Sequence, residues 1–201
     1  MAADQEGIDL DPEVMQAPIL TRRLFLRAPT IGDLPALTRL INDPSVARNT
    51  SRIPYPYPAA EGWRFLRASA SAPTPRRFAL FLITHRGNPR LIVGGAGVDW
   101  GPDQRPELGY WIGRAYRRRG FASEAAQALL HRIFAGGAVE EVEAWTRVGN
   151  IASQRVLRHS GFRRTGAGSR YSRMLHRHVR VISFVLTRAD FGHAAPVWQR
   201  A

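Results

Sequence analysis

The chain has 201 residues and no cysteine, which excludes disulfides, thiolate metal sites and cysteine nucleophiles. Its 44% hydrophobic and 22% charged residues are typical of a globular domain, and no apolar run approaches the ~18 residues of a membrane span. The formal net charge is +13 and all 29 basic residues are arginines, so the surface suits nucleic acid or a ligand that carries several phosphates.

The first third of the chain predicts a tail, a strand and two helices. Residues 1–18 are acidic, lack the basic and apolar regions of a signal peptide, and are expected to form a flexible tail of a cytoplasmic protein. Alternating residues at 24–27 predict a strand, and a leucine stripe at 34–41 predicts a helix that stops before a proline. A second helix is expected at 60–70.

The segment between these helices, residues 49–60, is expected to be an extended loop because it contains three prolines. Arg52, Tyr55 and Tyr57 are partly polar side chains on this loop. Binding residues concentrate on loops, so these three are candidates for substrate binding. The alternative is a stiff connector whose tyrosines only cover the core.

Three successive antiparallel strands are predicted in the middle of the chain. Residues 78–84 and 91–100 form a hairpin, and a third strand begins near Glu107. The third strand breaks at 114–119 into a basic loop, and past Gly120 an apolar stripe predicts a helix. This arrangement binds phosphate, because free N–H groups at the helix start point outward and the helix dipole adds positive charge. The loop matches neither the Walker pattern nor the dinucleotide fingerprint.

The remaining residues predict a strand, a helix and two further strands. Residues 139–146 alternate as a strand, and Asn150 begins a helix. A short strand at 161–168, a turn-rich basic stretch and a long last strand follow. Together these elements predict a single domain at 19–192, with a tail at 193–201.

Two motifs give this order of elements a family resemblance. The pattern Arg-x-x-Gly-x-Ala at Arg117, Gly120 and Ala122 resembles the acetyl-CoA pyrophosphate loop of the GNAT N-acetyltransferase superfamily. The runs ELGYWIGRAYRRRGFASEAA and, downstream, NIASQRVLRHSGFRRTG resemble the RimJ/RimL-type branch of ribosomal-protein-alanine acetyltransferases. The resemblance implies an α/β fold of the α+β kind. Its central sheet is mixed and mostly antiparallel, its fourth and fifth strands are parallel and splay apart, and helices flank it.

The resemblance also implies where acetyl-CoA binds. The pantetheine arm would lie between the splayed strands and pair with the backbone of Trp111, Ile112 and Gly113. Asn150 would reach the same arm, although helix N-capping alone would explain this residue. The residues that the resemblance implies for the pyrophosphate are Arg117, Arg118, Arg119, Gly120, Phe121, Ala122 and Ser123.

For the chemistry, the resemblance implies direct attack of an amine on the thioester, with no metal. Glu107, at the mouth of the fourth strand, is the candidate general base, directly or through water, and Ser153 is the candidate proton donor to the CoA thiolate. A solvated carboxylate and a first-turn serine are the alternatives. The last strand often carries an acid where this chain has Arg180, and His176 and His178 are alternative bases.

The expected function is acetyl transfer from acetyl-CoA to a primary amine, and the expected acceptor is the N-terminal amine of a protein or peptide. An α-amine, with an unperturbed pKa of about 8, loses its proton more readily than a lysine at about 10.4. The loop with Arg52, Tyr55 and Tyr57 would wall the acceptor site. Alternatives are a small-molecule amine, such as an antibiotic or metabolite, and a basic RNA- or ribosome-binding module, which the acid-free, arginine-rich run at 144–189 favours. Aromatic residues are not interleaved with that run, so nucleic acid is the weaker expectation. The acyl length and the choice between monomer and homodimer stay open.

Overall fold

The structure is a computed structural model that describes residues 15–70, 78–100 and 105–192. The two expected tails, 1–18 and 193–201, lie almost wholly outside the described residues. Met15, within the first of these ranges, is 3% exposed and packs in the main core. Within the described ranges, no helix is long and apolar enough to cross a membrane.

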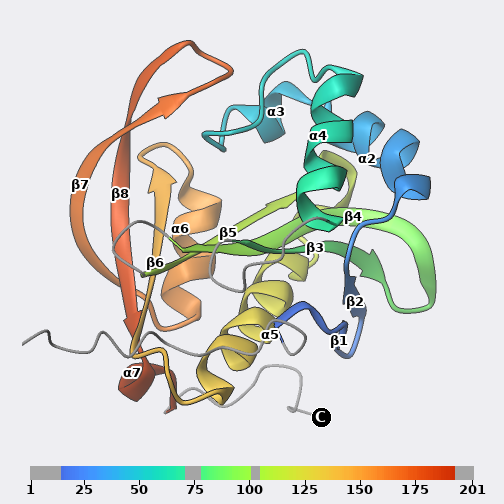
Figure 1. Ribbon diagram of the computed structural model, residues 1–201. Coiled ribbons are helices and arrows are strands. Elements are labelled where there is room, and N and C mark those ends of the chain that lie inside the picture. The colour runs from blue at the N-terminus through green and yellow to red at the C-terminus, as the bar shows by residue number, and fades with distance from the viewer. Residues whose placement is uncertain (1–14, 71–77, 101–104, 193–201) are drawn as a thin grey trace, which may run out of the picture.

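A twisted sheet runs through the molecule (Figure 1) in the order β1-β2-β3-β4-β5-β6-β8-β7. Its strands are β1 Ile19–Leu20, β2 Leu24–Arg27, β3 Phe78–His85, β4 Asn88–Trp100, β5 Pro106–Ile112, β6 Glu141–Arg147, β7 Arg163–Ser172 and β8 Arg177–Thr187. All neighbouring strands are antiparallel except β5 and β6, which are parallel. The expected mixed, mostly antiparallel sheet is therefore confirmed, with its parallel pair in the predicted place.

The parallel strands β5 and β6 separate soon after they meet. In the described chain they pair at one register position, Glu107 opposite Glu143. Beyond it β5 continues along β4 to Ile112, whereas β6 continues along β8 to Arg147. A wedge therefore opens between their C-terminal ends, as expected for splayed strands.

Helices cover both faces of the sheet (Figure 1). The helical elements are η1 Ile31–Asp33, α2 Leu34–Ile41, α3 Pro44–Ala47, α4 Ala59–Ala70, η2 Arg114–Tyr116, α5 Phe121–Ala135, α6 Ile151–His159 and α7 Arg188–Gly192. Neighbouring residues of a strand point to opposite faces, so Leu82 of β3 packs with α2 and α4 while Phe81 and Ile83 pack with α5. The molecule thus has a larger core under α5 and α6 and a smaller core under α2 to α4.

The strand predicted at 161–168 is longer than expected. β7 runs from Arg163 to Ser172 and pairs with β8 over most of its length, so part of the expected basic turn is strand. Because β7 is the edge strand and most of its residues are exposed, it lacks the apolar alternation that marks a half-buried strand.

Candidate active site

The loop between β5 and α5 presents backbone donors to solvent. Arg118 and Gly120 have positive φ angles, 63° and 75°, which turn successive peptide units in the manner of an anion-binding nest. Gly120 is the N-cap of α5 and has no side chain to cap it, so the amides of Phe121, Ala122 and Ser123 have no acceptor within the helix. These amides, the positive end of the helix dipole and the exposed guanidinium groups of the loop fit a diphosphate.

Arg23, in the turn between β1 and β2, holds this loop from behind. Its Nη1 donates to the Arg119 carbonyl at 2.8 Å, its Nε pairs with Glu124 at 2.7 Å, and its guanidinium lies 5.1 Å from the Phe121 ring centre. Glu124 is 4% exposed and also accepts from Thr21 Oγ1 at 2.7 Å. Burial by itself raises the pKa of Glu124, but these hydrogen bonds and the Arg23 charge outweigh burial and lower it. The first turn of α5 is thereby fixed to the sheet, which keeps its outward-facing amides in place.

Alternate residues of β5 point their backbone N–H and C=O groups into the wedge between β5 and β6. The Gly113 amide donates to a carbonyl of β4 at 2.9 Å, so Gly113 and Trp111 direct their backbone groups toward β4. Tyr110 and Ile112 direct theirs into the wedge, where the Ile112 carbonyl accepts from Arg117 Nε at 3.0 Å. Of the three residues expected to pair with a pantetheine arm, this geometry favours Ile112 and adds Tyr110.

Asn150 and Ser153 lie at the start of α6, across the wedge from β5. Asn150 is the N-cap, and its Oδ1 accepts from the Ser153 amide at 3.2 Å. The Ser153 Oγ lies 3.0 Å from Tyr110 Oη. Burial raises the pKa of Tyr110, and the hydrogen bond with Ser153 only partly opposes this. Tyr110 is therefore a neutral phenol that can donate to Ser153, which leaves the serine hydroxyl proton for a third group.

Glu107 lies where β5 and β6 meet, and both of its carboxylate oxygens have donors. Oε1 accepts from Trp145 Nε1 at 2.7 Å, and Oε2 pairs with Arg170 Nη2 at 2.7 Å. The Arg170 guanidinium also lies 5.2 Å from the Trp145 ring centre, so the three side chains form one cluster from three strands. A carboxylate has about four lone-pair positions, so Glu107 can still accept from an amine beside it.

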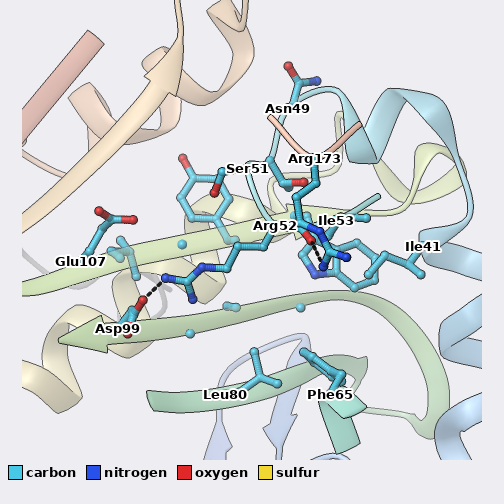
Figure 2. A pocket seen from close by; sticks show the side chains of 18 of the residues that line it. Ile41, Asn49, Ser51, Arg52, Ile53, Phe65, Leu80, Asp99, Glu107 and Arg173 are labelled. Atoms are coloured by element: carbon cyan, nitrogen blue, oxygen red, sulfur yellow. Dashed lines mark hydrogen bonds and ion pairs between the residues drawn. The ribbon is translucent and has the colours of Figure 1, made fainter. Parts of the chain in front are cut away.

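A cavity of about 410 Å³ opens above β4 and β5, on the face that α2 and α4 cover (Figure 2). Its floor follows three cross-strand pairs: Gly95 with Trp111, Gly97 with Gly109, and Asp99 with Glu107. A Cβ at Gly95 would lie 2.6 Å from Trp111 Nε1, so glycine allows the indole to lie close against β4. A Cβ at Gly109 would meet nothing within 4 Å, so this position is open to the cavity.

The loop expected to bind substrate forms one wall of this cavity. Arg52 reaches from the loop to an ion pair with Asp99 (Figure 2). Tyr57 also lines the cavity, and burial, followed by the charge of Glu61, raises its pKa to about 12. Tyr55 is 41% exposed and is not among the described lining residues. The structure therefore brings two of the three predicted loop residues to the cavity.

Arg173, in the turn between β7 and β8, joins that turn to the same wall. Its amide donates to the Ser51 carbonyl at 3.0 Å, and its guanidinium forms a two-pronged ion pair with Glu61 of α4 at 2.8 and 3.0 Å. The hydrogen bonds from Arg173 lower the pKa of Glu61. By contrast, His176 and His178 are exposed, and neither lines the cavity in the described structure.

Sequence reasoning missed several residues that the structure brings to the site. Tyr110 could have been found, because it is two residues before Ile112 and shares its strand edge. Trp145 and Arg170 carry no local signal, because the register of distant strands brings them to Glu107. Asp99 is opposite Glu107 in the consecutive pair β4 and β5, and only the exact register of that pair identifies it. Arg23 likewise contacts the loop from a point far earlier in the chain. The described residues include no group of three or more His, Cys, Asp or Glu that could hold a metal ion.

Splayed strands beside a helix start with outward-facing amides are the arrangement that the resemblance implies for an acyltransferase that uses coenzyme A. The family comparison agrees, because residues 23–163 match the acetyltransferase (GNAT) domain. The chain belongs to this family and is an acetyl-CoA-dependent N-acetyltransferase.

Individual proteins that are similar to this chain in sequence or structure are also acetyltransferases. The N-acetyltransferase p20 of Bacillus licheniformis, itself uncharacterized, is 24% identical over 86% of this chain and 97% of its own. RimJ of Mycobacterium smegmatis, solved with a CoA disulfide, has a TM-score of 0.75 at 20% identity and covers 90% of each chain. RimL, a ribosomal L7/L12 alpha-N-protein acetyltransferase solved with coenzyme A, has a TM-score of 0.72 at 19% identity and covers 85% of this chain and 98% of its own. These structures share the fold of this protein.

Replacing Ser153 with alanine is expected to lower kcat by about tenfold or more and to change acetyl-CoA affinity little. A proton donor to the leaving thiolate acts mainly in the transition state, so turnover carries the loss. Stopped assays of thiol release and calorimetry measure the two quantities. Tyr110→Phe is the matched variant, since it keeps the serine hydroxyl and should lose less. A loss confined to binding would give Ser153 a structural or cofactor-anchoring role.

Proposed function

We propose that this enzyme acetylates the α-amine at the N-terminus of a protein or peptide. The observation that carries the proposal is the position of Glu107, which lies at the junction of the wedge and the 410 Å³ cavity. This volume is typical of a pocket for a small ligand or a chain end. The name of RimL, an alpha-N-protein acetyltransferase, supports the same acceptor class.

Acetyl-CoA supplies a thioester whose carbonyl carbon the acceptor amine attacks, with coenzyme A as the leaving group. Glu107 takes the proton that the amine must lose, because its carboxylate faces the cavity and retains accepting positions. The amides of Tyr110 and Ile112 point into the wedge, where donors can stabilise negative charge on the carbonyl oxygen. Ser153 gives its proton to the departing thiolate and can be reprotonated through the Tyr110 hydroxyl or water.

We propose an α-amine as the acceptor because the candidate base in the cavity is a carboxylate, which is a weak base. Glu107 is the carboxylate at the wedge, and the two histidines considered as alternative bases lie outside the cavity lining. An α-amine has an unperturbed pKa of about 8 and is partly neutral at pH 7, whereas a lysine at about 10.4 would need a stronger base. The net charge of +13 also favours a neutral or acidic partner in the approach.

The proposal is tested by competition between two peptides of equal composition. One has a free N-terminus and a blocked lysine, and the other has a blocked N-terminus and a free lysine. We expect acetylation of the first only, measured by thiol release and by mass spectrometry of the modified position. Acetylation of the lysine peptide alone, or of small amines but neither peptide, would contradict the N-terminal assignment.

A further inference from the structure

The sheet beneath the cavity presents three successive rows of side chains that differ in polarity. Neighbouring strands pair in register, so side chains of one row share a face. The first row holds Asp99 and Glu107, the second holds Leu80, Gly97 and Gly109, and the third holds Leu82, Gly95 and Trp111. Successive rows are two residues apart, or about 7 Å. The cavity therefore has an acidic end and an apolar end, and the glycines form a hollow in the sheet surface between them, with the Arg52 side chain reaching past it to Asp99 (Figure 2).

We propose that the acceptor carries a bulky apolar group next to its amine, so that the preferred substrate is a chain whose first residue is leucine, phenylalanine or a similar side chain. This inference rests on the proposed function in placing the amine at Glu107. It adds which N-terminal residue the cavity selects.

The hollow in the middle row is the first part of the argument. Gly109 is exposed to the cavity, and a Cβ there would meet nothing within 4 Å. Leu80 lines the same row from β3, is half-buried, and is not a member of the described core clusters. An amine beside Glu107 therefore places the side chain of its own residue over Gly109 and against Leu80, about 7 Å along the strand.

The far end of the cavity extends the apolar surface. The smaller core under α2 to α4 consists of two clusters, and Trp111 packs against both: one includes Ile41 and Ile53, and the other includes Phe65. All four residues line the cavity. A branched or aromatic side chain that enters from the acidic end can contact these four apolar side chains, and its burial is favourable in proportion to its apolar area.

The ion pairs of the cavity exclude the polar alternative. Its three lining carboxylates, Glu61, Asp99 and Glu107, each pair with an arginine. The polar lining residues Asn49, Thr50, Ser51, Arg52, Arg64 and Arg173 belong to the loop, α4 and the β7–β8 turn, whereas Leu80, the glycines and Trp111 of the sheet offer no side-chain partner except the indole N–H. A charged or polar first side chain that lies on the sheet would therefore lose water at a cost. Selection therefore comes from apolar contact and not from a specific charge.

The test compares peptides that are identical except at residue 1, which is leucine, phenylalanine, alanine, serine or aspartate. We expect kcat/KM to be highest for leucine and phenylalanine, by about tenfold or more over alanine and serine, with aspartate lowest. Equal kcat/KM for the five peptides, or a preference for serine or aspartate, would overturn the inference while leaving N-terminal acetylation intact.

Two variants connect the preference to the hollow. Gly109→Val should fill it and lower kcat/KM for the leucine and phenylalanine peptides by about tenfold or more, with the alanine peptide little changed. The alanine peptide then reports that the variant is folded and active. Leu80→Gln should lower the same preference, while Leu91→Gln, the same change at a 37% exposed site outside the cavity lining, should not. An equal loss for all peptides in Gly109→Val would count against the inference.

2-Phenylethylamine separates the two proposals. If this amine is acetylated and no peptide is, the N-terminal assignment fails, whereas the apolar acceptor site stands. If peptides are acetylated without regard to residue 1, the assignment stands and the apolar preference fails.

Discussion

Gly120→Asp is expected to weaken acetyl-CoA binding by about 100-fold or more while the fold persists. The carboxylate would stand at the start of α5, where we expect the pyrophosphate to bind, and like charges brought together cost several kcal/mol. The backbone of Gly120 has a φ of 75°, which aspartate adopts more readily than most residues. Calorimetry with acetyl-CoA measures the loss, and circular dichroism measures the fold.

Two matched variants separate charge from backbone strain. Gly120→Asn has nearly the same shape without the charge and should keep a larger share of the affinity than Gly120→Asp. Gly137→Asp adds the same residue at the same φ of 75°, at the opposite end of α5, where a Cβ would meet nothing within 4 Å. The affinity of the Gly137→Asp variant for acetyl-CoA should equal that of the unmodified protein. Undiminished binding in a folded Gly120→Asp protein would remove the pyrophosphate from this loop.

Glu107→Gln is expected to lower kcat/KM by about 100-fold or more, which is the lower range for loss of a general base. The amide oxygen can still accept from the Trp145 indole, whereas the amide nitrogen is a donor and cannot replace the oxygen that pairs with Arg170, so that ion pair is lost. Acetyl-CoA affinity should change little, because the loop expected to bind the pyrophosphate is untouched. Thiol release over a range of acceptor concentrations gives the kinetic constants.

Glu143→Gln is the control for this change. Glu143 is the register partner of Glu107 on β6, pairs with Arg105 at 3.1 Å, and does not line the 410 Å³ cavity. Its activity should stay within about twofold of the unmodified enzyme, as for most surface changes. Equal losses in both variants would indicate an electrostatic effect of the whole surface, and full activity in Glu107→Gln would require another base.

The parts of the site that sequence predicted are the local ones. Gly120 and the basic loop could be read because a strand, a glycine and a helix start follow one another within a short stretch. The N-cap at Asn150 is equally local. The order of the strands could be predicted for the same reason, and the resemblance supplied the splayed pair. β7 was underestimated because an edge strand with few buried residues lacks the alternation on which such predictions depend.

The contacts that sequence could not predict depend on register. Trp145 and Arg170 reach Glu107 because β6 pairs beside β5 and β7 folds back along β8. A shift of one residue in either pairing would turn these side chains to the opposite face. The Tyr110–Ser153 hydrogen bond likewise joins a strand and a helix that are distant in sequence. The acidic end of the cavity is therefore a product of the assembled sheet.

Among the described residues, the single backbone bridge between β5 and β6 also has a consequence for the rigidity of the sheet. The sheet therefore has two parts, strands β1 to β5 and strands β6, β8 and β7, whose backbones meet at Glu107 and Glu143. A ligand arm that hydrogen-bonds to both edges of the wedge would connect the two parts of the sheet. Binding of the ligand would therefore reduce the motion of one part relative to the other. At 100 times its dissociation constant such a ligand adds about 2.7 kcal/mol to the free energy of unfolding. Glu107, the proposed general base, lies at this junction of the two parts of the sheet.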